Sequence, residues 1–135
     1  MSLEAYLTGF DYEERSEMKM DSKGLIPLLI SKKAVLVDIR FPEEVAAWRI
    51  GFGLAIPLNE LPGRLAELPK DKIIVTACPH KDRAIIAMTY LKTQGYEAKY
   101  LADGLVSLTE YLRGDQARDL AEAIDLKEPP LPSKP

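Results

Sequence analysis

The feature that most constrains this chain is the alternation of short apolar runs with helical patterns. The runs are β-branched or continuously apolar, as strands buried on both faces require. They are Ala34 to Ile39, Leu54 to Leu58, Lys72 to Ala77 and Ala98 to Ala102. Strands that alternate with helices along a chain predict an α/β fold with a mostly parallel sheet.

The predicted helices are marked by apolar residues three or four positions apart, the spacing of one helix face. The stripes are Leu25/Leu28/Leu29, Ala84/Ala87/Met88/Leu91, Leu105/Leu108/Leu112 and Ala117/Leu120/Ala121/Ile124. A further helix is predicted in "PEEVAAW", because Pro42 and two acidic residues suit a first helical turn. These helices flank the predicted strands.

Length and composition favour one ordinary globular domain. The chain has 135 residues, of which 47% are apolar and 29% charged, enough for one hydrophobic core. A net charge of −3 gives no reason to expect nucleic acid or an anionic membrane as a partner. No apolar run approaches the roughly 20 residues of a membrane span, and the start lacks a secretory pattern. We therefore expect a cytoplasmic location.

The two ends differ from the alternating unit. Residues 1–17 are rich in Glu and Tyr and are predicted to form an arm or an extra helix. Residues 127–135 hold four prolines in nine positions and are predicted to be a disordered tail. Residues 18–126 remain as the predicted domain.

The only cysteine, Cys78, directly follows the run "IIVTA" and precedes Pro-His-Lys-Asp-Arg. Reactive groups collect at the carboxyl ends of strands in open α/β sheets. If a helix begins near Asp82 or Arg83, backbone N–H groups and the helix dipole form an anion site, and Lys81 and Arg83 help to lower the thiol pKa. We interpret Cys78 as a thiolate nucleophile; the alternative is an inert buried thiol.

One cysteine and one histidine cannot form a disulfide or a structural zinc site, and we predict no metal and no cofactor.

Four segments in order, from about Ser22 to Arg113, resemble the rhodanese (sulfurtransferase) family. They are "VLVDIRFPEEV", "AIPLNEL", "LPKDKIIVTACPHKDRAIIAMTYLKTQGY" and "AKYLADGLVSLTEYL". The resemblance implies a three-layer fold with a central, mostly parallel five-stranded sheet flanked by helices. It also implies that Cys78 accepts sulfane sulfur from a small donor such as thiosulfate, holds it as a persulfide, and passes it to a thiol, to cyanide or to a protein acceptor.

Each residue around Cys78 receives an expected role. Pro79, His80, Lys81, Asp82 and Arg83 form the expected substrate and persulfide loop, in which Asp82 is expected to cap the helix. His80 either orients the substrate or is simply exposed.

Residues outside the loop have auxiliary roles at most. Arg40 is a candidate for substrate contact together with Asp38, although a buried supporting ion pair is the commoner use of such residues. Glu44 is expected to brace Arg40 or to face solvent. Trp48, Tyr90 and Tyr100 are expected to pack.

The sequence departs from the family pattern at three places. Trp48 and Arg49 replace a Gly-His pair, Asp103-Gly104 replaces Gly-Gly, and Pro79 removes one backbone donor from the loop. The first two changes, together with the N-terminal arm and the proline-rich tail, favour a second hypothesis, a non-catalytic rhodanese-like interaction module. A phosphatase or arsenate reductase is a third, more distant hypothesis, because those relatives have five residues between cysteine and arginine and this chain has four.

Overall fold

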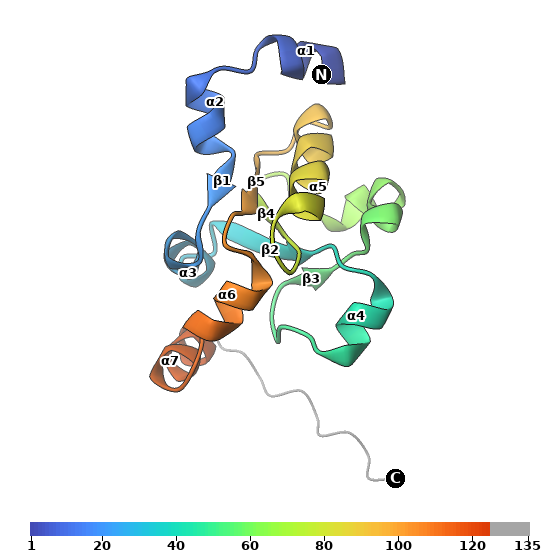
Figure 1. Ribbon diagram of the computed structural model, residues 1–135. Coiled ribbons are helices and arrows are strands. Elements are labelled where there is room, and N and C mark those ends of the chain that lie inside the picture. The colour runs from blue at the N-terminus through green and yellow to red at the C-terminus, as the bar shows by residue number, and fades with distance from the viewer. Residues whose placement is uncertain (125–135) are drawn as a thin grey trace.

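A computed structural model describes residues 1–124 and shows a five-stranded sheet (Figure 1). The strands are β1 (Lys19–Met20), β2 (Ala34–Asp38), β3 (Leu54–Ala55), β4 (Ile73–Ala77) and β5 (Ala98–Leu101). Their order across the sheet is β1-β5-β4-β2-β3, and every pairing is parallel. The predicted fold class is therefore confirmed. The two-residue strand β1 is an element that the apolar pattern did not reveal.

Helices surround the sheet at the predicted positions. They are α1 (Leu3–Thr8), α2 (Tyr12–Glu17), α3 (Ser22–Ile30), α4 (Pro42–Ala47), α5 (Asp82–Thr93), α6 (Gly104–Tyr111) and α7 (Asp115–Ala123), together with a 3₁₀ segment η1 (Leu58–Glu67). The 3₁₀ segment was not predicted, because Pro62 and Gly63 interrupt its apolar pattern.

Alternate residues of the central strand divide the core into two layers, which makes the fold three-layered. Ile74 and Cys78 face one layer, and Val75 and Ala77 face the other. The first layer is covered by α5 and η1, and the second by α3 and α6 (Figure 1). Cys78 therefore lies on the face of the sheet that α5 covers.

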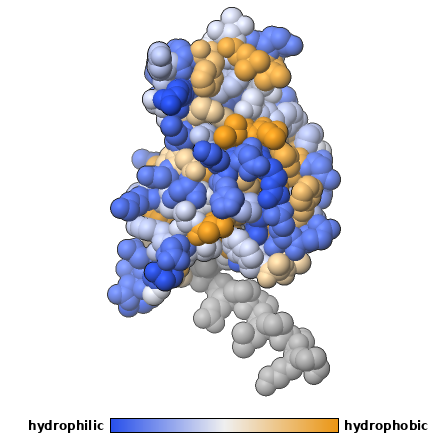
Figure 2. Space-filling model, viewed as in Figure 1, coloured by the Kyte–Doolittle hydropathy of each residue, from blue (hydrophilic) through white to orange (hydrophobic). Residues whose placement is uncertain are grey.

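The first seventeen residues form two short helices, and their contacts reach the C-terminal end of α5. Tyr6 is 8% exposed, and its hydroxyl donates to Glu14 at 2.9 Å. Burial, together with this hydrogen bond, raises the pKa of Tyr6. Glu14 also pairs with Lys92 of α5 at 3.2 Å. Apolar residues remain at the surface over α1 (Figure 2), where Leu3 and Leu7 are exposed.

The division into arm, domain and tail stays a prediction, and the predicted tail, residues 127–135, lies outside the described residues. Within residues 1–124, no helix has the length and apolar character that crossing a bilayer requires.

Tyr6 provides a test of whether the N-terminal arm contributes to stability. We expect Tyr6→Ala to lower the free energy of unfolding by about 2 kcal/mol, because a buried ring is lost. Tyr12→Ala is the matched control, since Tyr12 is 87% exposed, and its effect should stay within about 0.5 kcal/mol. Urea unfolding of the full chain measures both. Equal effects would contradict the packing of the arm.

Candidate functional site

Cys78 lies at the carboxyl end of β4, near the centre of the sheet. The preceding residue, Ala77, pairs with Asp38 at the end of β2. The cysteine is free and its side chain is fully buried, in contact with the core layer that includes Ala84 of α5. The predicted position at a strand end is thus observed, and the sulfur is shielded from solvent.

The start of α6 fixes the loop that follows the cysteine. The N–H of Leu105 donates to the carbonyl of Cys78 at 2.9 Å, and the N–H of Val106 donates to that of Pro79 at 3.3 Å. Gly104 has φ +77°, and a Cβ there would lie 2.2 Å from the Pro79 oxygen. Only glycine permits this approach. The first two loop carbonyls are therefore occupied by α6.

The N–H groups of the rest of this loop and of the first turn of α5 have no protein partner within residues 1–124. Five successive backbone donors make no hydrogen bond to any protein acceptor within residues 1–124, namely those of His80, Lys81, Asp82, Arg83 and Ala84. The first N–H groups of a helix have no intrahelical acceptor, and the N-cap residue Lys81 supplies no side-chain cap. Such a run at the start of a twelve-residue helix is suited to bind an anion.

The side chains of the loop are placed differently from one another. His80, Lys81 and Asp82 are exposed, whereas Pro79 and Arg83 are half-buried. The expectation that Asp82 caps α5 is wrong. Asp82 is the first helical residue and makes no cap hydrogen bond, because a cap must lie one residue earlier to reach the free N–H groups of the first turn.

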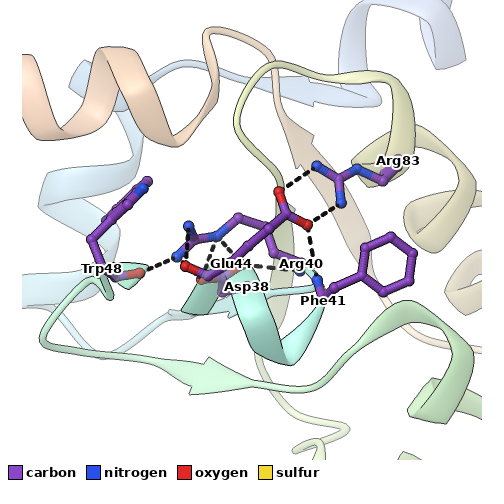
Figure 3. Close-up of polar contacts among 6 residues, drawn as sticks. All are labelled: Asp38, Arg40, Phe41, Glu44, Trp48 and Arg83. Atoms are coloured by element: carbon purple, nitrogen blue, oxygen red, sulfur yellow. Dashed lines mark hydrogen bonds and ion pairs between the residues drawn. The ribbon is translucent and has the colours of Figure 1, made fainter. Parts of the chain in front are cut away.

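Glu44 of α4 holds Arg83 of α5 in a bidentate ion pair (Figure 3). The two oxygens lie 2.6 and 2.9 Å from the guanidinium nitrogens, and one of them also accepts the N–H of Phe41 at 3.1 Å. The expectation that Glu44 braces Arg40 or faces solvent holds in part, and the main partner of its carboxylate, Arg83, was not predicted. Arg40 donates a hydrogen bond to the backbone carbonyl of Glu44 at 3.4 Å. No local pattern signals this pair, because the residues are 39 positions apart.

The ion pair shifts the pKa values of both partners. The hydrogen bond from Arg83 is the main cause that lowers the pKa of Glu44 from 4.5 to about 2. The hydrogen bond to Glu44 is likewise the main cause that raises the pKa of Arg83, and negative charge on Cys78 raises it further.

Asp38 and Arg40 form a second, buried ion pair beside the first. Their exposed fractions are 2% and 1%, and Nη2 of Arg40 lies 2.8 Å from Oδ2 of Asp38. The same nitrogen donates to the carbonyl of Trp48 at 3.0 Å, and the guanidinium carbon lies 3.9 Å from the centroid of the Trp48 ring (Figure 3). The supporting ion pair that was the alternative for these residues is what the structure shows. Contact between Arg40 and a substrate stays a prediction.

Trp48 and Asp103, which belong to the two motifs that differ from the family pattern, make structural contacts of their own. Trp48 supplies both a carbonyl and a ring to the buried Arg40. The carboxylate of Asp103 accepts the N–H of Ser22 at 3.1 and 3.3 Å, so it joins the start of α3 to the start of α6. These contacts support the scaffold around the cysteine loop.

Comparison with known proteins identifies the family. The model of the rhodanese-like domain matches residues 23–111. The chain therefore belongs to the rhodanese-like domain family.

Particular relatives include single-domain sulfurtransferases. A sulfurtransferase of Allochromatium vinosum is 39% identical over 79 residues, which are 58% of this chain and 74% of that protein. The mitochondrial thiosulfate sulfurtransferase RDL2 of Saccharomyces cerevisiae is 32% identical over 93 residues. The match covers 59% of this chain and 61% of the RDL2 chain. The solved human single-domain sulfurtransferase TSTD1 superimposes with a TM-score of 0.62 at 28% identity, covering 69% of this chain and 96% of that one.

Gly104 provides a test of how closely α6 approaches the cysteine loop. We expect Gly104→Ala to destabilise the fold by about 1–3 kcal/mol, because a Cβ would meet the Pro79 and His80 carbonyls at a positive φ. Gly63→Ala is the control, since a Cβ there has no neighbour within 4 Å. Urea unfolding compares the two variants. A Gly104→Ala protein as stable as the control would contradict the described contact.

The low pKa of Glu44 predicts how stability depends on pH. A depressed carboxyl pKa adds stability that is fully present above about pH 4.5 and is lost as the pH falls through about 2. Both side chains are partly solvated, at 27% and 33% exposure, so the contribution is about 1 kcal/mol or less. Glu44→Gln should therefore have a lower urea midpoint of unfolding than wild type at pH 7. The difference between the two midpoints should become smaller toward pH 2.5.

Glu43→Gln is the control for this titration, because Glu43 is an exposed acid on the same helix and has no ion pair in the part of the chain that the structure describes. Its urea midpoint should follow that of wild type at every pH. If the difference in urea midpoint between Glu44→Gln and wild type stayed constant with pH, the ion pair could not be the cause of that difference.

Proposed function

We propose that this chain is a single-domain sulfurtransferase that carries a persulfide on Cys78. The observation that carries the proposal is the run of unpaired N–H groups from His80 to Ala84, which begins two residues after the cysteine. A terminal persulfide sulfur is an anion, and backbone donors at a helix start stabilise such a charge. The sulfurtransferases among the relatives support the same reaction class.

In the first half-reaction the Cys78 thiolate attacks the outer sulfur of a sulfane donor. With thiosulfate, a new bond forms between Sγ and that sulfur, the sulfur–sulfur bond of the donor breaks, and sulfite leaves with its electron pair. The N–H groups of the loop bind the resulting persulfide anion, and Lys81 adds a positive charge.

In the second half-reaction a nucleophilic acceptor, a thiolate or cyanide, attacks the terminal sulfur. The persulfide bond breaks, and its electron pair returns to Sγ as the Cys78 thiolate. The transferred atom leaves as an acceptor persulfide or as thiocyanate. Both half-reactions balance without a cofactor.

In this proposal the backbone N–H groups supply most of the anion binding, because acidic residues compensate the positive side chains of the loop. Arg83 is already engaged by Glu44, and the exposed Asp82 opposes the charge of Lys81. We therefore include among the donors both thiosulfate and a persulfide delivered by another protein.

Full burial of Cys78 requires the loop to open before a donor can reach the sulfur. The same burial favours the second candidate function, a rhodanese-like interaction module in which the thiol is not used. That function predicts ordinary thiol reactivity and binding of a partner that survives Cys78→Ser.

Intact mass spectrometry tests the sulfurtransferase directly. Incubation with thiosulfate should add the mass of one sulfur atom to wild type and none to Cys78→Ser, and cyanide should remove it. The rate of iodoacetamide alkylation against pH should give a thiol pKa below about 8.5, the ordinary value of cysteine.

A lack of sulfur uptake from thiosulfate and from a small organic persulfide would reject the sulfurtransferase. If the alkylation pKa also lay near the ordinary value, the interaction module would be favoured instead. Hydrolysis of an aryl phosphate that exceeded sulfur transfer would favour a phosphatase.

A further inference from the structure

A cavity of about 550 Å³ lies between α4 and the segment that follows β3. Its walls include Val45, Trp48 and Pro57 and the charged residues Arg40, Arg49, Glu60 and Arg64, and none of the residues of the cysteine loop. Pockets for small molecules typically have about 300–1,000 Å³ and apolar walls with a few polar groups. The volume of this cavity lies in that range, and its walls combine apolar side chains with four charged ones.

The cavity and the cysteine loop lie on different sides of α4. Pro42, Val45 and Ala46 line the cavity and share one helix face, because they are three and four positions apart. Glu44 points instead toward Arg83 and the loop (Figure 3). The cavity is therefore separate from the proposed sulfur-transfer site, and the inference below does not rest on that function.

Trp48 is an aromatic wall of this cavity that is both accessible and held in place. Its side chain is 39% exposed, and the buried Arg40 contacts its ring and its carbonyl, as described above. Arg40 is in turn fixed by Asp38. A ring that is already ordered loses little conformational entropy when a flat molecule packs against it.

One of the three arginines in the cavity wall has no ion-pair partner. Arg40 is paired with Asp38, and Arg64 is paired with Glu60 and Glu67 at 3.4 and 2.6 Å. Arg49 lines the cavity, is exposed, and makes no ion pair anywhere in residues 1–124. A guanidinium in this state is suited to bind a carboxylate, sulfonate or phosphate.

We propose that this cavity binds a small aromatic molecule with one anionic group, its ring against Trp48 and its anion on Arg49. The apolar side chains of Val45 and Pro57 bury the rest of the ring system. The ligand class follows from this combination of a fixed indole, an apolar wall and a free guanidinium.

The single tryptophan of the chain makes the proposal directly measurable. Titration of the full chain with anilinonaphthalene sulfonate should quench Trp48 and produce saturable energy transfer from its indole to the probe. Arg49→Gln should weaken binding about five-fold, because a charge-assisted contact is lost. Neutral phenylnaphthylamine, which lacks the sulfonate, should bind wild type more weakly than the sulfonate does.

Two neighbouring alanines of α4 supply a matched pair of variants. Ala46 lines the cavity and Ala47 does not, and both are exposed. Ala46→Glu should weaken binding of the sulfonate probe at least about ten-fold, because it fills the cavity and repels the anion. Ala47→Glu adds the same charge to the same helix and should change affinity by less than about two-fold.

Three results would overturn the proposal. They are a titration without saturable energy transfer from Trp48, equal weakening by Ala46→Glu and Ala47→Glu, and binding of the neutral probe as tight as that of the sulfonate. Circular dichroism of each variant checks that the fold is kept. Arg49→Gln remains a usable test if Ala46→Glu fails to fold, since Arg49 is exposed.

Discussion

The approach of α6 to the cysteine loop is the contact on which the site depends. Two N–H groups of α6 bind the carbonyls of Cys78 and Pro79, and Gly104 lets the helix come close enough to do so. The carbonyl oxygen and the N–H of one trans peptide point in opposite directions, so the hydrogen bond from Val106 to the Pro79 carbonyl turns the N–H of His80 away from α6. The N–H groups of residues 81–84 are free because they lie at the start of α5. The run of free donors in the candidate site therefore forms from backbone structure and requires no charged side chain.

Two ion pairs at the same edge of the sheet have different roles. Asp38 and Arg40 are almost completely buried and join the end of β2 to Trp48. Glu44 and Arg83 are partly solvated and join α4 to the first turn of α5. The buried pair holds the scaffold, since breaking it would leave an unpaired charge in the core. The solvated pair is easier to open, because water can hydrate both charges when they separate.

The sequence was sufficient for most of the fold and for the position of the cysteine. Apolar runs located β2, β4 and β5, and helical spacing located α3, α5, α6 and α7, because strong periodicity is a local property. The contacts of Glu44 and Asp103 could not be predicted, since each joins residues distant in the chain. Strand β1 was missed because two residues are too few to show a pattern. The burial of Cys78 also depends on how α5 packs, which no local pattern specifies.

The edge strands of the sheet are short. Both outer strands, β1 and β3, are only two residues long, while the inner strands have four or five. Unpaired backbone groups along an outer strand are the usual starting point for unwanted pairing between molecules. With so few such groups available, each copy of the chain presents little template for fibre growth, even though its interior is a fully parallel, strongly apolar sheet.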